Sequence, residues 1–148
     1  MKIILIDTNV ALDILLKRQD YDNAKRVYTL AEENIIFCYI TASAVTDIFY
    51  LAQKDLGKNQ AKEALKELLK TFKPATVTDS HIYQALDLDW DDFEDSVQYV
   101  VGESFSADYI VTRNAKDYSS SSIPVVTPEQ FIQAVTVSED TDQVTGNN

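Results

Sequence analysis

Short apolar runs and stretches of helical apolar spacing alternate along most of this 148-residue chain. The runs are rich in β-branched and aromatic residues, as strands buried on both faces are. They predict strands at residues 2–6, 35–40, 75–77, 109–111 and 125–126. Because strands alternate with helical patterns, the sequence predicts an α/β domain with a central, mainly parallel sheet.

Between the strands, apolar residues recur three and four positions apart, which is the spacing of amphipathic helices. The clearest pattern covers residues 60–72, and Gly57 ends the helix before it. Pro128 suits the first turn of a last short helix that ends near Val135. The expected N-caps are Asp7-Thr8-Asn9, Thr41 or Ser43, Asp79 or Ser80, and Asp92 or Asp91. The side chains expected to face inward from the helix near residue 92 are Phe93, Val97, Val100, Val101 and Ser104.

Length and hydrophobic content predict one folded domain over residues 1–135. The chain has the commonest domain size, and its 45% hydrophobic residues suffice for a core. From residue 136 to 148 no apolar stripe can be drawn, and Glu139, Asp140 and Asp142 add negative charge. We therefore predict a disordered acidic tail over residues 136–148.

The charge and the rare residues exclude several classes of function. Thirteen Lys and Arg against 24 Asp and Glu give a net charge of −11, which excludes a broad basic surface for nucleic acid. One cysteine, Cys38, and one histidine, His81, exclude an internal disulfide and Cys-rich zinc sites and disfavour His-based ones. The longest apolar run near the start, residues 3–6, is too short for a signal peptide or membrane span. We expect a soluble, cytoplasmic domain whose chemistry depends on carboxylates.

The acids are concentrated in one part of the chain. No Lys or Arg lies between Lys73 and Arg113, a stretch that holds nine acids. Such density costs stability through repulsion. Solvated loops and helix starts account for Asp87 and Asp89, whereas other carboxylates are candidates to share a divalent metal ion. Asp95 is three residues from Asp92 and four from Asp91, so in a helix these acids share one face.

Two further acids lie at informative places. Asp7 directly follows the first strand, where open α/β sheets bind ligands, although an acid there can also cap a helix. Asp47 lies at the margin of an apolar helix stripe, where a buried charge requires a metal ion or a lysine as partner. Mg²⁺ and Mn²⁺ prefer oxygen ligands, and in phosphodiester chemistry they activate water and neutralise charge.

Three segments resemble the PIN-domain family of metal-dependent ribonucleases, which includes the VapC-like toxins. Residues 3–9 (IILIDTN) resemble the opening strand and its Asp-Thr-Asn, and residues 92–98 (DFEDSVQ) resemble the acidic helix start. Residues 107–118 (ADYIVTRNAKDY) resemble the strand and the Thr-Arg-Asn…Asp-Phe turn that close the site. The resemblance implies a three-layer α/β/α fold with a central parallel sheet.

The resemblance also implies a set of site residues. Asp7 and Asp95 match carboxylates that bind Mg²⁺ or Mn²⁺, and Asp47 stands where the family usually has Glu. Because Asp is one methylene shorter, contact of Asp47 with the metal through water is an alternative to direct contact. The fourth ligand position falls on Asn114, with Asp117 as the acidic alternative. The candidates for contact with substrate, or for support of the ligands, are Thr8, Asn9, Thr112 and Arg113, with Lys116 as a second cation near an RNA phosphate.

Three functions are therefore considered. The first is a Mg²⁺- or Mn²⁺-dependent endoribonuclease with an RNA substrate, which the resemblance connects with a homodimer bound to a small antitoxin protein. The second is a PIN-like RNA- or protein-binding module with little or no catalysis, which Asp47 and the charge of −11 favour. The third is a phosphatase or phospho-acceptor domain; that class places a second acid in Asp-x-Asp, where this chain has Asn9.

Overall fold

A sheet of five parallel strands forms the centre of the molecule. The computed structural model describes residues 1–136. The tail is predicted over residues 136–148, and residues 137–148 of it lie outside the described residues. The strands are β1 (Lys2–Ile6), β2 (Ile36–Thr41), β3 (Phe72–Ala75), β4 (Tyr109–Val111) and β5 (Val125–Val126). Their order in the sheet is β3-β2-β1-β4-β5, and all neighbours pair in parallel.

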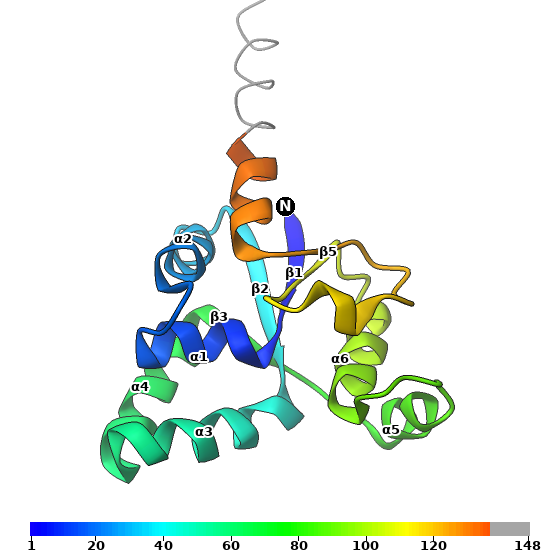
Figure 1. Cartoon of the computed structure of the whole chain (residues 1–148), viewed down its shortest axis with the longest axis horizontal. Coiled ribbons are helices and arrows are strands. Elements are labelled where there is room, and N and C mark those ends of the chain that lie inside the picture. Colours follow the sequence, from blue (N-terminus) through cyan, green and yellow to red (C-terminus); the bar gives the residue numbers. More distant parts are fainter. Residues whose placement is uncertain (137–148) are drawn as a thin grey trace, which may run out of the picture.

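Helices cover both faces of this sheet (Figure 1). One face carries α1 (Thr8–Leu16), α2 (Tyr21–Glu32), α3 (Ala42–Leu56), α4 (Lys58–Thr71) and a last helix over residues 128–136. The other carries α5 (Asp79–Leu86), α6 (Phe93–Ser104) and the 3-10 helix η1 (Ala115–Tyr118). The predicted three-layer α/β/α architecture is confirmed. None of the helices in residues 1–136 combines the length and apolar character that crossing a membrane requires.

The central strand β1 is apolar from Ile3 onward, and its last three residues are buried between the two helical layers. Ile4 and Ile6 face the core formed by α1–α4, whereas Leu5 faces the opposite core with Tyr99 and Ile110. All three β1 side chains have no exposed area. The polar residue that follows them, Asp7, is therefore carried to the end of the strand with buried structure on either side.

The third strand begins earlier than the sequence predicts. We expected it at residues 75–77, but it begins at Phe72, directly after α4. Phe72 continues the helical spacing of α4, so the sequence assigns it to the helix. In the structure its ring is fully buried, edge-on to Tyr28 at 5.4 Å, and its backbone pairs with Cys38 of β2. Pro74 is tolerated because β3 is an edge strand.

The N-cap residues follow the prediction at three helices and depart from it at one. Asp7 and Asp92 cap α1 and α6 with their side chains. The cap of α5 is Thr78 rather than Asp79 or Ser80, and His81 completes a capping box by accepting the backbone N–H of Thr78. The residue before α3 is Thr41, but its side chain makes no capping hydrogen bond.

Helix α6 is buried around its circumference rather than along one stripe. Residues 95–102 are all buried, whereas Phe93 and Ser104, expected inside, are exposed. The reason is that α6 contacts two cores: Tyr99 packs against the sheet, while Val97, Val100 and Val101 pack with α5. A helix packed on two sides shows no single apolar stripe, and its first turn carries Asp95 into the interior.

Candidate functional site

The candidate site lies where the chain reverses its direction across the sheet. From β1 the strands are added on one side as β2 and β3, and then on the other side of β1 as β4 and β5. In open α/β sheets, ligands bind outside the carboxyl ends of the strands at such a switch point. Asp7 follows β1 and Thr112 follows β4, and the Asp7 N–H donates to Val111 O at 3.0 Å.

The carboxylate of Asp7 is buried and surrounded by hydrogen-bond donors. Its Oδ1 accepts from Thr8 N at 2.7 Å and from Gln98 Nε2 at 3.1 Å. Its Oδ2 accepts from Thr112 Oγ1 at 2.7 Å and from Asn9 Nδ2 at 3.3 Å. Each oxygen of Asp7 therefore accepts two hydrogen bonds. Asp7 is thus both the cap of α1 and the point where α1, α6 and the segment after β4 meet.

All of these donors are neutral groups, and no ion pair within residues 1–136 involves Asp7. Burial raises the pKa of Asp7 above its usual range, and the hydrogen bonds from Thr112 and Gln98 oppose this shift only in part. A buried carboxylate with a raised pKa and no cationic partner is characteristic of functional sites.

Asp95 is a second buried acid close to Asp7. Only 9% of its surface is exposed, and its Oδ1 accepts from the hydroxyl of Tyr118 at 3.2 Å. Burial, followed by the negative charges of Asp7 and Asp92, raises the pKa of Asp95 to about 7. Burial, followed by the negative charges of Asp7 and Asp95, also raises the pKa of Tyr118, so its hydroxyl keeps its proton.

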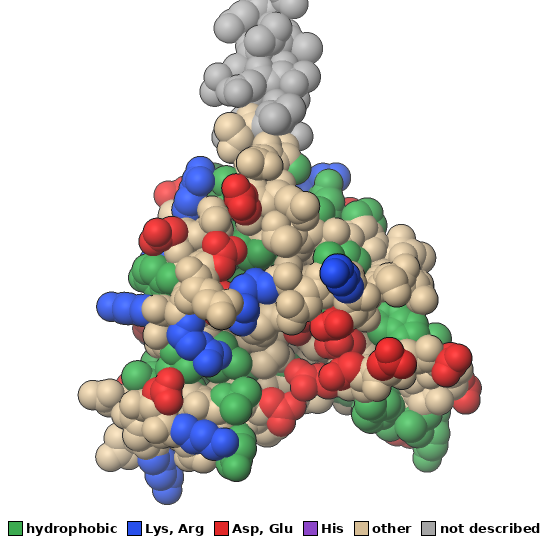
Figure 2. Space-filling view, in the orientation of Figure 1, with side chains coloured by type: hydrophobic (Ala, Val, Ile, Leu, Met, Phe, Trp, Pro, Cys, Tyr) green, Lys and Arg blue, Asp and Glu red, His purple; other side chains and the backbone are tan. Residues whose placement is uncertain are grey.

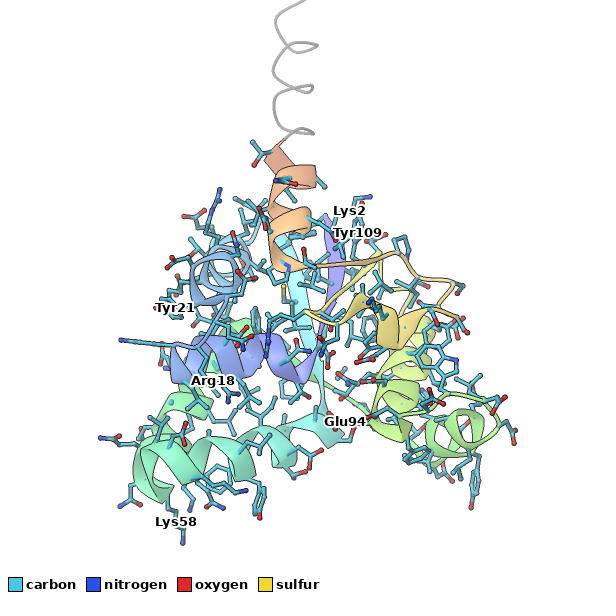
Figure 3. The ribbon with its side chains drawn as sticks, viewed as in Figure 1. Lys2, Arg18, Tyr21, Lys58, Glu94 and Tyr109 are labelled. Atoms are coloured by element: carbon cyan, nitrogen blue, oxygen red, sulfur yellow. The ribbon has the colours of Figure 1, made fainter. Side chains whose placement is uncertain are left out.

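Glu94 joins this group, although the sequence reasoning did not place it in the site. Its Oε1 accepts from Thr8 Oγ1 at 2.8 Å, which ties the start of α6 to the start of α1 (Figure 3). Burial raises its pKa, and the charges of Asp47 and Asp7 raise it further. The available signal was its position beside Asp95, directly after the cap of α6.

Asp47 lies on the outer side of the group. It is exposed on α3, and its charge acts on Glu94. Because Asp47 is exposed, the burial that would demand a metal ion or a lysine as its partner is absent. The ion pairs of residues 1–136 involve Glu63, Glu67 and Asp13, not Asp47.

The donor set fits a hard divalent cation at Asp7 and Asp95. Both are oxygen donors, the charge of Asp7 raises the pKa of Asp95, and a doubly charged ion would relieve that repulsion. Within the described part of the chain, no group of three Asp, Glu, His or Cys side chains is arranged to hold an ion. The three-carboxylate set of Asp7, Asp47 and Asp95 therefore stays a prediction.

Three of the four candidate substrate residues bind the site's own side chains. Thr8 is bonded to Glu94, and Thr112 to Asp7. Asn9 bridges Asp7, Thr112 and the backbone N–H of Arg113, which donates to Asn9 Oδ1 at 3.2 Å. These contacts position Asp7 and fix the segment after β4.

The side chain of Arg113 is held by α1. Its Nε lies 2.8 Å from Asp13 Oδ2, without the alignment of a hydrogen bond, and its Nη1 donates to Gln19. Asp13 is fully buried, and burial raises its pKa, opposed by the charges of Arg113 and Arg18. Sequence reasoning missed Asp13; the signal was an acid within the apolar run of α1.

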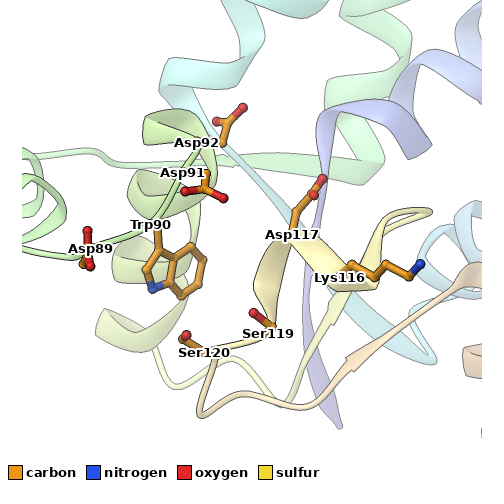
Figure 4. A pocket seen from close by; sticks show the side chains of 8 residues that line it. All are labelled: Asp89, Trp90, Asp91, Asp92, Lys116, Asp117, Ser119 and Ser120. Atoms are coloured by element: carbon orange, nitrogen blue, oxygen red, sulfur yellow. The ribbon is translucent and has the colours of Figure 1, made fainter.

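A small acidic pocket of about 150 Å³ lies between the segment before α6 and η1 (Figure 4). Asp91 and Asp92 reach it from the segment before α6, and Asp117 from η1, while Lys116 extends away from them. Asp117 and Asn114, the two candidates for a fourth ligand, are both exposed. The charge of Asp117 contributes to the raised pKa of Asp95, so Asp117 lies within reach of the site.

Acidic side chains gather over this edge of the molecule, and basic side chains lie to one side, over α1, α2 and α4 (Figure 2). Fold and site together define a three-layer α/β protein with a buried acidic site at its topological switch point. The sequence model of the PIN domain matches residues 3–116, and the chain belongs to the PIN-domain family.

Several known proteins are similar to this chain over most of its length. Ribonuclease VapC1 of Aquifex aeolicus is 23% identical over 136 residues, which cover 88% of this chain and 93% of the relative. Solved structures with the same fold include VapBC2 of Rickettsia felis bound to a promoter DNA fragment (TM-score 0.65, 17% identity, 84% of this chain and 96% of that one). A toxin–antitoxin complex from Klebsiella pneumoniae is also similar, with a TM-score of 0.61 and 23% identity over 84% of this chain and 97% of that one. So is Mycobacterium tuberculosis VapC20, a toxin that cleaves the sarcin–ricin loop, with a TM-score of 0.59 and 16% identity over 72% of this chain and 86% of that one.

The raised pKa of Asp95 predicts how stability depends on pH without metal. Folded Asp95 keeps its proton up to about pH 7, whereas the unfolded chain loses it near 3.8, so Asp95 lowers stability as the pH rises through this range. In EDTA at pH 8, Asp95→Asn should raise the melting temperature by a few degrees, or about 1 kcal/mol. At pH 5 the gain should be smaller. Exposed Asp89→Asn is the control, and a variant less stable than the parent at pH 8 would show that Asp95 serves as a structural cap.

The Asp13–Arg113 pair predicts a different stability effect. Arg113→Met leaves a buried charge without its partner and should cost about 3 kcal/mol in urea unfolding. The double variant Asp13→Leu/Arg113→Met removes both charges and should recover most of that loss. Glu67→Gln, which breaks an exposed pair with Lys70, should cost less than about 1 kcal/mol. Equal losses in the single and double variants would contradict this account of the pair.

Proposed function

We propose that this PIN domain is a Mg²⁺- or Mn²⁺-dependent endoribonuclease that hydrolyses RNA phosphodiester bonds. The observation that carries the proposal is the buried pair of acids, Asp7 and Asp95, with raised pKa values and only neutral hydrogen-bond donors. Oxygen donors without a balancing charge are suited to a hard cation. The ribonuclease name of the Aquifex relative supports RNA as the substrate.

Within this proposal, Asp7 and Asp95 hold the metal ion, and Asp47 contributes directly or through water from its exposed place on α3. Asp117 is favoured over Asn114 as the fourth ligand because its charge acts on Asp95. When bound, the ion supplies an activated water and neutralises charge at the phosphorus. Gln98, with the other donors, keeps both oxygens of Asp7 in a fixed orientation.

Contacts to RNA are few and local in this proposal. Thr8, Asn9 and Thr112 serve mainly by orienting Asp7 and Glu94, beside which a scissile phosphate would bind. Arg113 is partly exposed although Asp13 holds it, so it can offer its outer edge to a neighbouring phosphate. The basic side chains over α1, α2 and α4 provide positive charge to one side of the acids (Figure 2).

We further propose that the protein is the toxin of a toxin–antitoxin pair, forms a homodimer and binds a small antitoxin protein. The similar structures from Rickettsia felis and Klebsiella pneumoniae, which are assemblies of this kind, support the antitoxin partner. An RNA-cleaving toxin would act in the cytoplasm, where its substrate is.

The alternative is a PIN module that binds RNA or protein and cleaves little or nothing. Two observations favour it: Asp47 is an exposed, shorter side chain at a position where the resembling family has Glu, and the net charge is −11.

The deciding experiment is cleavage of a panel of single-stranded RNAs with Mn²⁺, with Mg²⁺ and with EDTA. We expect cleavage that EDTA abolishes. Asp7→Asn and Asp95→Asn should each reduce the rate by orders of magnitude, because loss of a metal ligand removes both water activation and charge neutralisation. Asp87→Asn and Asp89→Asn, which alter exposed acids, serve as matched controls and should cleave like the parent.

Intact RNA in all conditions, with retained RNA binding, would favour the binding module. An equal loss in Asp89→Asn and Asp95→Asn would mean that the wrong carboxylate has been assigned.

A further inference from the structure

Tyr118 brings a hydroxyl into the acidic site from the core of the domain. It ends η1, only 2% of its surface is exposed, and its ring packs with Leu5 and Ile110 and meets Trp90 edge-on at 5.8 Å. This packing fixes the ring, so the position of the hydroxyl follows from the fold and not from a mobile side chain.

The hydroxyl lies at both buried acids. It donates to Asp95 Oδ1 at 3.2 Å, and it lies close enough to Asp7 for each group to shift the pKa of the other. The other hydrogen-bond donors of Asp7, such as Gln98 and Thr112, do not reach Asp95. Tyr118 therefore lies close to both carboxylates and is hydrogen-bonded to one of them, Asp95.

We propose that the Tyr118 hydroxyl takes the place of a cation between Asp7 and Asp95 in the metal-free protein and competes with a divalent ion for Asp95. The inference rests on the proposed metal site. A phenol has one proton and can satisfy one carboxylate at a time, whereas a doubly charged ion attracts both. Tyr118 is thus a positioning residue that holds two repelling carboxylates together until an ion binds.

This role fixes the sign of the effect of removing the hydroxyl. Without it, the metal-free protein loses a hydrogen bond to a buried charged group, a loss that is expensive in a dry environment. The ion-bound protein loses less, because the ion already balances the carboxylate. Removal of the hydroxyl should therefore widen the free-energy difference between the metal-free and the ion-bound protein, which tightens ion binding.

The test is Tyr118→Phe, which deletes one oxygen and keeps the packed ring. Mn²⁺ binding is measured by titration calorimetry at pH 8, and thermal melts are recorded in EDTA and in saturating Mn²⁺. We expect the variant to bind Mn²⁺ about tenfold more tightly. Its melting temperature should fall by several degrees in EDTA and by much less in Mn²⁺.

Tyr99→Phe is the matched control. Tyr99 is also buried in this core, but its hydroxyl bonds Ser122 rather than a carboxylate. Its removal should lower the melting temperature in EDTA and in Mn²⁺ alike and leave Mn²⁺ affinity unchanged. A purely structural role for Tyr118 would produce the same result as this control.

Unchanged or weaker Mn²⁺ binding by Tyr118→Phe would overturn the inference, and so would a parent protein that binds no Mn²⁺. RNA cleavage is assayed separately on the same samples. A parent that binds Mn²⁺ but leaves RNA intact would overturn the proposed nuclease and leave the role of Tyr118 standing.

Discussion

Burial of the Asp7 carboxylate is the constraint on which the site depends. A carboxylate at the end of a strand buried on both faces is very costly unless its oxygens are satisfied. The chain meets this demand with donors from three separate elements: Thr8 and Asn9 at the start of α1, Gln98 in α6 and Thr112 after β4. Each donor fixes the element that carries it. The site is therefore the junction that holds the two helical layers to the central strand, and not an addition to a finished scaffold.

The same junction contains an unbalanced charge. Asp95 comes close to Asp7 because α6 is buried on two sides and its first turn enters the interior. Neutral donors satisfy the hydrogen-bonding capacity of these acids but do not remove their repulsion, which contributes to the raised pKa of Asp95. Such repulsion lowers the stability of the fold, and sites where a fold retains a destabilising group of charges are expected to be functional. The Asp13–Arg113 pair shows the opposite solution, since Asp13 of α1 is a buried acid with a cation as its partner.

The sequence predicted what depends on local pattern and missed what depends on distant partners. Strands β1, β4 and β5 were predicted with their observed bounds, because polar residues end each apolar run. The start of β3 was wrong because Phe72 suits the spacing of α4 as well as a buried strand position. Asp7 and Asp95 stood out by position and motif, and the structure places them side by side. The partners that sequence reasoning missed lie far away in sequence: Gln98 is 91 residues from Asp7 and Tyr118 is 23 from Asp95. Periodicity carries no information on such pairs.

Under the proposed function, the charge distribution couples RNA binding to the ion. RNA is a polyanion, and a protein of charge −11 with its acids gathered over the site repels it where cleavage would occur. The basic residues over α1, α2 and α4 lie to one side, and Arg113 shares its charge with Asp13. A bound divalent ion would balance the two negative charges of Asp7 and Asp95 and would present a positive centre to a phosphate oxygen. The ion then serves twice, as the attraction that admits a phosphate and as the group that activates its cleavage. A domain built in this way needs no broad basic surface, which reconciles an acidic chain with an RNA substrate.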